Sequence, residues 1–185
     1  MLTRVVLAAA ALACAAPLTA PLVAQNAPSW MGEMPRDVNG AQKKMIDLAK
    51  AIPESAYGWR PGAGTRSVGE VLLHVASDNY FIPIAMGKPA PAASGITTDM
   101  KSVGEYEKRK MSKDQIAAEL EASYKHLHEA MSLTTDANAA ETIKFFGQDW
   151  TRMRAMTLTV THLHEHLGQL IAYARSNNVT PPWSQ

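Results

Sequence analysis

Four stretches of the chain carry apolar residues at helical spacing, and this pattern limits the possible folds more than any other feature. The stretches run roughly over residues 35–51, 67–86, 112–131 and 151–176. Their apolar residues recur every three or four positions, the period of one helix face. In the third stretch that face consists of Ile116, Leu120, Tyr124, Leu127 and Met131. Four amphipathic helices most simply pack as an all-α, up-down four-helix bundle.

The predicted helix ends agree with this reading. Ser67 is followed three residues later by Glu70, and Ser112 by Gln115; both pairs match the capping box that opens a helix. Glycine and proline are dense at 57–64 and 88–98, which predicts loops there. We also expect a short helix over 103–109 and a short extended piece within 141–147, where apolar and polar residues partly alternate.

The N-terminus has the three-part layout of a secretory signal peptide. Arg4 precedes an apolar run from Val5 to Ala16, and small residues and prolines follow as far as Ala24. The run is shorter than the roughly 20 residues that a membrane-spanning helix needs. We therefore expect residues 1–24 to be removed, 25–34 to form a flexible lead-in and 35–185 to form the bundle. The mature protein is then periplasmic or secreted, with no stable membrane span.

Cys14 is the only cysteine of the chain. Residues 11–14 weakly resemble a lipobox, so a lipoprotein anchored through Cys14 is a minority alternative, and an uncleaved N-terminal anchor is another. Cleavage after Ala24 leaves no thiol, which excludes a disulfide, a cysteine nucleophile and a thiolate ligand. It also removes Arg4, so that 17 of the 18 basic residues remain against 17 acidic ones. This neutral balance excludes a nucleic-acid binder, which needs a basic surface.

Two histidines, His162 and His166, stand four residues apart in the last predicted helix. At this spacing they share one helix face, about 40° apart, and two neutral ring nitrogens on one face can chelate a transition metal. His74 lies in the apolar second stretch. If the two stretches pack as neighbours, three imidazoles converge and leave coordination positions open. The alternative is that all three are core histidines with ordinary hydrogen-bond partners.

The other three histidines fit this arrangement less well. His164 lies on the opposite helix face from its two neighbours and should point to solvent. His126 and His128 are two positions apart, so at most one of them faces the core. The sequence His-Leu-His-Glu occurs at both 126–129 and 162–165, an echo too short to indicate an internal repeat.

Two longer motifs resemble signatures of the DinB/YfiT-like superfamily. Tyr57-Gly58-Trp59-Arg60-Pro61-Gly62, followed by residues 67–75, is similar to its second-helix signature, and residues 162–175 are similar to its last-helix signature, H-x-x-x-H-x-G-Q. The resemblance covers most of residues 36–183. It implies a four-helix bundle that holds a divalent metal through His74, His162 and His166, and it allows a homodimer. A site of three imidazoles suits Zn²⁺, Ni²⁺ or Fe²⁺.

The expected activity is that of a metal-dependent hydrolase acting on a small molecule with metal-bound water. Glu70 and Asp78 lie one turn before and after His74 and are the candidate catalytic proton carriers. Glu70 has a competing role in the capping box, and Asp78 in orienting an imidazole. The resemblance also implies a thiol-dependent S-transferase, although cytosolic thiols should be scarce outside the membrane. A binding module for a metal or small ligand, without turnover, is the third alternative.

Overall fold

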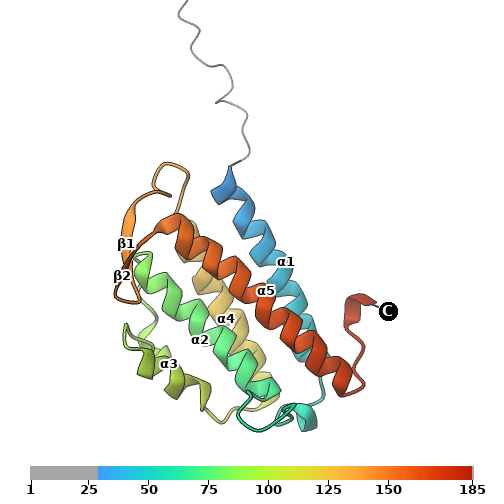
Figure 1. The fold of residues 1–185 in the computed structure, drawn as a ribbon. Helices are drawn as coiled ribbons and strands as arrows, with labels where there is room; N and C mark the ends of the chain where they lie inside the picture. Colours follow the sequence, from blue (N-terminus) through green and yellow to red (C-terminus); the bar gives the residue numbers. More distant parts are fainter. Residues whose placement is uncertain (1–28, 185) are drawn as a thin grey trace, which may run out of the picture.

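A computed structural model describes residues 29–184, and four long helices form its body (Figure 1). A short helix, α3, and a β-hairpin are added to the side of this bundle. The elements are α1 (Trp30–Ala51), α2 (Val68–Ala85), α3 (Met100–Glu107), α4 (Lys113–Met131), β1 (Thr142–Phe145), β2 (Gln148–Thr151) and α5 (Arg152–Ser176). Short 3₁₀ turns cover Glu54–Ala56, Ala92–Ser94 and Pro182–Ser184. The predicted four-helix bundle is confirmed.

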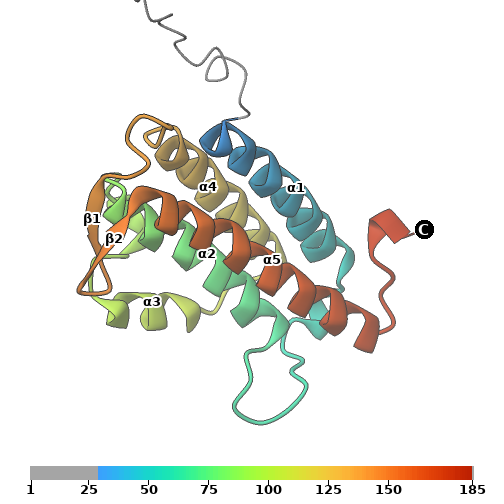
Figure 2. The ribbon, with the colours of Figure 1, turned by 45° about the horizontal axis from the view of Figure 1, so that its top comes forward.

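The helices do not simply alternate in direction. Helices α1 and α5 run one way, and α2 and α4 run the other way (Figures 1 and 2). Two consecutive long helices, α2 and α4, can be parallel because the connection through α3 returns the chain to the end where α2 began. Helix α1 packs on α4 and α5, and α2 also packs on both of these. This arrangement makes α2 and α5 neighbours, as the predicted histidine cluster requires, and they run antiparallel.

Local sequence determines where α2 and α4 begin. The Ser67 hydroxyl accepts a hydrogen bond from the backbone N–H of Glu70, and the Glu70 carboxylate accepts one from the backbone N–H of Ser67. Ser112 and Gln115 make the same reciprocal pair at the start of α4. Each pair satisfies two backbone donors that the first helical turn leaves free. Both predicted capping boxes are confirmed.

Helix α1 begins at Trp30, five residues before the predicted start at Pro35. The prediction relied on the helical spacing of the apolar residues within 35–51. Instead, the Ser29 side chain caps the helix by accepting from the backbone N–H of Gly32, and Met31 is buried in the core. Residues 30–34 of the predicted lead-in are therefore helical. The predicted signal peptide, Cys14 and residues 25–28 lie outside the described residues.

Helix α2 is the most enclosed of the long helices, with 13 buried residues out of 18. Helices α3, α4 and α5 all pack against it, which explains why its sequence is apolar nearly all round rather than along one stripe. Its few half-buried positions include His74 and Asp78. Within residues 29–184, no helix combines the length and the apolar content needed to cross a bilayer.

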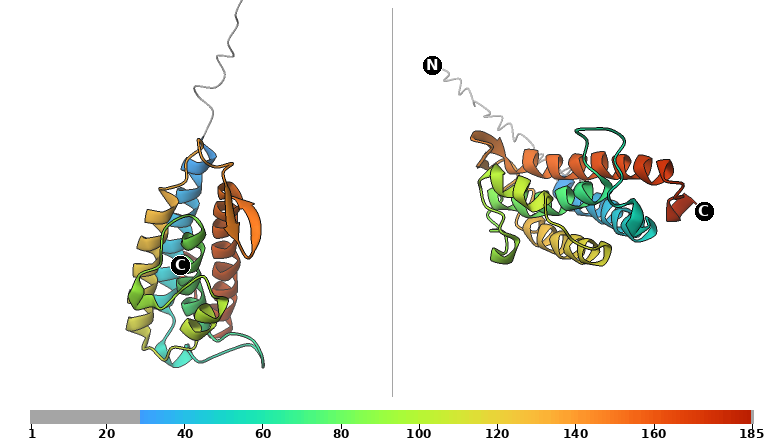
Figure 3. Two further views of the ribbon diagram at one scale, coloured as in Figure 1. Left: turned by 90° about the vertical axis from the view of Figure 1, so that its left-hand side faces the viewer. Right: turned by 90° about the horizontal axis from the view of Figure 1, so that it is seen from below.

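The hairpin lies at the opposite end of the bundle from the loop that joins α1 to α2 (Figure 3). Strand β1 falls within the extended piece predicted for 141–147, whereas β2 was not predicted. The two strands pair antiparallel, with Phe145 opposite Gln148. Phe146 and Gly147 form the turn, and both have positive φ angles, 50° and 70°. Thr151 ends β2 and also caps α5, with its hydroxyl accepting from the backbone N–H of Arg154.

Candidate metal centre

Helix α5 presents its histidines on two faces, as their spacing predicts. His166 is buried and His162 half-buried, whereas His164 is exposed and its Nδ1 bonds to the carbonyl oxygen of Val160 in its own helix. The inward pair lies side by side, with the two Nε2 atoms 3.1 Å apart. Thr151 places this face in register by fixing where α5 begins.

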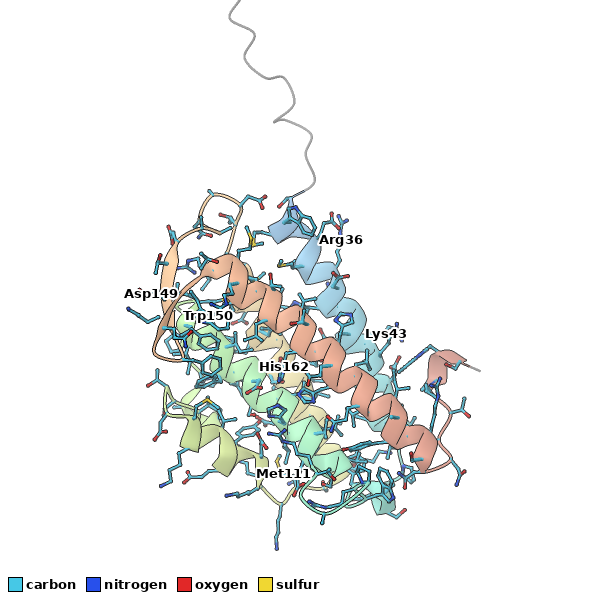
Figure 4. All side chains as sticks on the ribbon, viewed as in Figure 1. Arg36, Lys43, Met111, Asp149, Trp150 and His162 are labelled. Atoms are coloured by element: carbon cyan, nitrogen blue, oxygen red, sulfur yellow. The ribbon has the colours of Figure 1, made fainter. Side chains whose placement is uncertain are left out.

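His74 completes a cluster of three imidazoles. Its Nε2 atom lies 3.2 Å from Nε2 of His162, and its ring packs edge-on against both His162 and His166, with centroid separations of 5.1 Å and 4.6 Å. One ring nitrogen from each of the three residues falls within 4.8 Å of the other two. His162 lies near the middle of the bundle, where α5 passes α2 (Figure 4). The structure thus brings together all three histidines selected from the sequence.

The hydrogen bonds at the outer ring nitrogens fix the tautomers of two of these rings. Nδ1 of His74 lies 2.8 Å from Oε1 of Glu107, and Nδ1 of His166 lies 2.8 Å from Oε1 of Gln169. Both partners are acceptors, since the Gln169 amide nitrogen donates to the hydroxyl of Tyr173. Each Nδ1 therefore carries the hydrogen, and each Nε2 presents a lone pair to the interior of the cluster. Nε2 of His162 carries at most one hydrogen, so it can donate to at most one of these lone pairs, and Oδ2 of Asp78, 3.0 Å away, competes for the same hydrogen.

These converging lone pairs match the donor set of a divalent transition metal. A His nitrogen binds Zn²⁺ at about 2.0–2.1 Å, so donors separated by 3.1–3.2 Å would subtend an angle of about 100° at one ion. This angle lies between those of tetrahedral and octahedral coordination. The pKa of His166 falls to about 4, chiefly because burial disfavours the charged ring, while the bond to Gln169 opposes the shift. His166 is therefore neutral near pH 7, as a ligand must be.

Asp78 lies beside the cluster, one helical turn after His74. Its Oδ2 atom is 3.0 Å from Nε2 of His162 and 3.5 Å from Nε2 of His74. Asp78, His74 and His162 all line a cavity of about 390 Å³, whereas His166 does not. The Asp78 carboxylate consequently stands on the open side of the site, where a small molecule would enter.

Glu107 is a residue of the site that the sequence analysis missed. It comes from α3 and accepts a hydrogen bond from His74, and its other oxygen lies 2.8 Å from Nε of Arg66. Burial alone would raise the pKa of Glu107, but the bonds to His74 and Arg66 outweigh burial and lower the pKa to about 2. The only signal in the sequence was the expected short helix at 103–109, which gave no indication that it packs on α2.

The second predicted catalytic carboxylate, Glu70, is engaged elsewhere. Its two oxygens accept from the backbone N–H of Ser67 and from the guanidinium of Arg60. The pKa of Glu70 is lowered, first by the backbone bond at Ser67. Glu70 thus serves in the capping box, and its catalytic role stays a prediction. The aromatic rings of Trp59 and Tyr173 pack edge-on, 5.2 Å apart, on the side of His166 where Gln169 lies.

Comparisons with known proteins give a family match and structural neighbours for this chain. The family model described as the DinB superfamily matches residues 38–170. A DinB-like protein from Bacillus cereus superposes with a TM-score of 0.68 at 17% identity, over 83% of this chain and 96% of that one. A DinB-like protein from Bacillus subtilis gives 0.61 at 15% identity, over 83% and 98%.

At these identities the structural likeness establishes the fold alone. The chain matches none of the curated proteins with which it was compared. The family match, in contrast, spans well over half of the sequence and contains all three clustered histidines. The chain therefore belongs to the DinB superfamily.

Proposed function

We propose that this protein is an exported enzyme of hydrolase type that depends on a divalent metal and acts on a small molecule. The observation that carries the proposal is the convergence of one ring nitrogen each from His74, His162 and His166 within 4.8 Å. Nε2 of His162 lies 3.2 Å from Nε2 of His74 and 3.1 Å from Nε2 of His166. At least two of these atoms present lone pairs, because Glu107 and Gln169 hold the hydrogens at the opposite ring nitrogens. Three imidazole ligands with an open side are typical of a catalytic metal site.

The three Nε2 atoms would hold the ion, and Zn²⁺, Ni²⁺ and Fe²⁺ all suit such a nitrogen donor set. When bound, the metal would supply Lewis acidity, which polarises a carbonyl group and acidifies water. Glu107 and Gln169 hold the rings of His74 and His166 in the orientation that ligation needs. The Asp78 carboxylate, on the cavity side of His162, is placed to accept a proton from the attacking nucleophile.

Export belongs to the same proposal, on the layout of residues 1–24. It favours hydrolysis over thiol transfer, since water is the nucleophile available outside the membrane. Cell fractionation and mass spectrometry of the mature N-terminus test this part. A full-length chain in the cytoplasm would contradict it.

The central experiment measures metal content and ester hydrolysis of the purified protein, with and without a low-molecular-weight thiol. We expect one divalent ion per chain and thiol-independent turnover of a model ester such as p-nitrophenyl acetate. Turnover only with the thiol would indicate the S-transferase, and a stoichiometric metal without any turnover would indicate a binding module. A protein that takes up no divalent metal would contradict the whole proposal.

Two carboxylate variants separate catalysis from folding. Asp78→Asn should lower kcat by about 10²–10⁴-fold, the usual contribution of general acid–base catalysis, while the metal content stays unchanged. Glu70→Gln should keep kcat and lower the free energy of unfolding by about 1 kcal/mol or less, because it weakens the cap of α2. The opposite result, loss of kcat in Glu70→Gln alone, would exchange the roles that we assign to the two residues.

A further inference from the structure

A second and larger cavity lies between the hairpin, the C-terminal end of α2 and the start of α3. Its volume is about 630 Å³. Apolar side chains dominate its wall, with Phe81 and Ile84 from α2, Met100 from α3, and Phe145 and Phe146 from the hairpin. The hairpin stands against this end of α2, as the positions of Asp149 and Trp150 show (Figure 4).

This cavity adjoins the one beside the histidines, because the two share part of their walls. The shared residues are Phe81, Met100 and Phe146. The continuity follows from helix geometry, because residues spaced by three or four positions share one face of α2. From His74 that face passes through Asp78 and Phe81 to Ala85. One stripe of α2 thus leads from the metal ligands, past the carboxylate, to the apolar wall.

All three phenylalanines of the chain gather at this place. The ring of Phe81 lies 5.8 Å from that of Phe145 and 5.9 Å from that of Phe146, measured between centroids. The ring of Trp150, which does not line the cavity, packs edge-on against Phe145 with the centroids 5.1 Å apart. Aromatic rings at such separations form a rigid apolar surface.

The conformation of Phe146 is a second, independent observation. A two-residue hairpin turn with positive φ at both positions is normally made by Asn-Gly or Asp-Gly. Here Phe146 has a φ of 50° and the residue is 52% exposed, although positive φ is unfavourable for a bulky residue. The turn does not favour a phenylalanine here. Its ring packs on those of Phe145 and Phe81, with centroids 4.0 Å and 5.9 Å away, but the residue stays half exposed on the cavity wall, where the ring can contact a ligand.

We propose that this cavity binds the apolar part, an alkyl or aryl group, of the small molecule whose polar group reacts at the three histidines. The apolar part lies among Phe81, Ile84, Met100, Phe145 and Phe146, and the polar group reaches His74 and His162 past Asp78. The position of the polar group rests on the function proposed above. Binding of the apolar part rests on the cavity alone.

Straight-chain hydroxamic acids, from acetohydroxamate to octanohydroxamate, test both parts at once. The hydroxamate is a metal-binding group, and the alkyl chain probes the cavity. We expect the affinity of the metal-loaded protein, measured by calorimetry, to rise by roughly four-fold for each added methylene until the cavity is filled. His162→Ala should lower the affinity for every hydroxamate of the series by a similar factor, and the affinity should still rise with chain length.

Phe146→Asn removes the ring and keeps the turn, because asparagine tolerates a positive φ. The variant should bind octanohydroxamate about ten-fold more weakly than the unmodified protein, and its affinity for acetohydroxamate should change little. Leu133→Ala is the matched control, since Leu133 is 45% exposed at the end of α4 and lines neither cavity. It should leave the whole series unchanged.

The outcomes separate the two proposals. Affinities that do not depend on chain length would overturn the apolar site, whatever the metal content. A dimer that Phe146→Asn dissociates, with no dependence on chain length, would also overturn it and assign the surface to a second copy of the chain. If the affinity rises with chain length and His162→Ala leaves every affinity of the series unchanged, the apolar site is supported and the metal centre is contradicted.

Discussion

Two helices of this protein contain the same four residues, His-Leu-His-Glu, and put them to different uses. One copy is His126–Glu129 in α4 and the other is His162–Glu165 in α5. Only the α5 copy contributes to the histidine cluster. Their comparison shows what a metal site requires beyond a favourable local sequence.

The α4 copy forms no cluster. His126 is buried, its ring packs 5.3 Å from that of Tyr80, and its Nε2 has no hydrogen-bond partner among the described residues. His128 lies on another face of the helix, with its Nε2 2.7 Å from the side-chain oxygen of Gln42 in α1. At most one of the two faces the core, as predicted.

The α5 copy differs in what surrounds it. His166 follows His162 by one turn on the same face, whereas the equivalent position after His126 is Ala130. Across the interface, α2 supplies His74 and Asp78 to His162, but it supplies Tyr80 to His126. The cluster therefore depends on one additional residue of the same helix and on the residues of the neighbouring helix, and not on the shared sequence.

The largest expected effect comes from removing His162, the first histidine of the His-Leu-His-Glu sequence in α5. His162→Ala should weaken Zn²⁺ binding by more than about 100-fold, because the loss of a ligand exceeds the 10–100-fold cost of losing an outer partner. The equivalent change in the other copy, His126→Ala, should leave the Zn²⁺ affinity unchanged. Competition with a chelating dye measures both. Equal affinities of His162→Ala and the unmodified protein would refute the ligand assignment.

The comparison also shows how far the sequence alone could lead. Caps at Ser67 and Ser112, the bundle and the inward pair of α5 depend on residues three or four positions apart, and the structure confirms all of them. Such patterns are local, so spacing is enough to recognise them. His74 could be joined to the pair only through the resemblance to a family, because its distance from His162 depends on how α2 and α5 pack.

Features that depend on tertiary packing were missed. Nothing in residues 100–107 indicates that α3 docks on α2 and brings Glu107 to His74. Strand β2 was missed because Gln148–Thr151 is too short and too polar to be recognised without its partner strand. The early start of α1 was missed because it depends on burial of Met31 and on capping by Ser29, whereas the prediction followed the spacing of apolar residues within 35–51.

Metal removal should destabilise the protein through the α5 cluster alone. Binding at 100 times Kd contributes about 2.7 kcal/mol to the free energy of unfolding, which for a domain of this size corresponds to a Tm higher by roughly 5–10 °C. Adding a chelator should therefore lower the Tm of the unmodified protein by that amount, as measured by calorimetry. His126→Phe should show the same decrease and His162→Ala none. A chelator effect that persists in His162→Ala would place the metal elsewhere.

Glu107→Gln tests whether α3 contributes to the cluster through His74. Losing the carboxylate should weaken Zn²⁺ binding by about 10–100-fold, since it removes the charged acceptor that holds the His74 ring. Glu105→Gln is the control, because Glu105 lies in the same helix and its carboxylate pairs with the exposed Lys101 rather than with a residue of the cluster. The Zn²⁺ affinity of Glu105→Gln should equal that of the unmodified protein. An unchanged affinity in Glu107→Gln would show that the packing of α2 alone orients His74.

The smallest expected effect concerns pH and the α4 copy. Burial, followed by the charge of Lys88, lowers the pKa of His126 below its usual value of 6.5. A histidine that is harder to protonate in the folded state than in the unfolded state favours folding fully only above pH 6.5, and this contribution is lost as the pH falls below that value.

In the metal-free protein, His126→Phe keeps an aromatic ring beside Tyr80 and removes the titrating group. Its free energy of unfolding, measured with urea between pH 7.5 and about pH 5, should fall less steeply with acid than that of the unmodified protein. Parallel curves would mean that His126 is protonated equally easily in both states, and that the acid sensitivity arises from the α5 cluster instead.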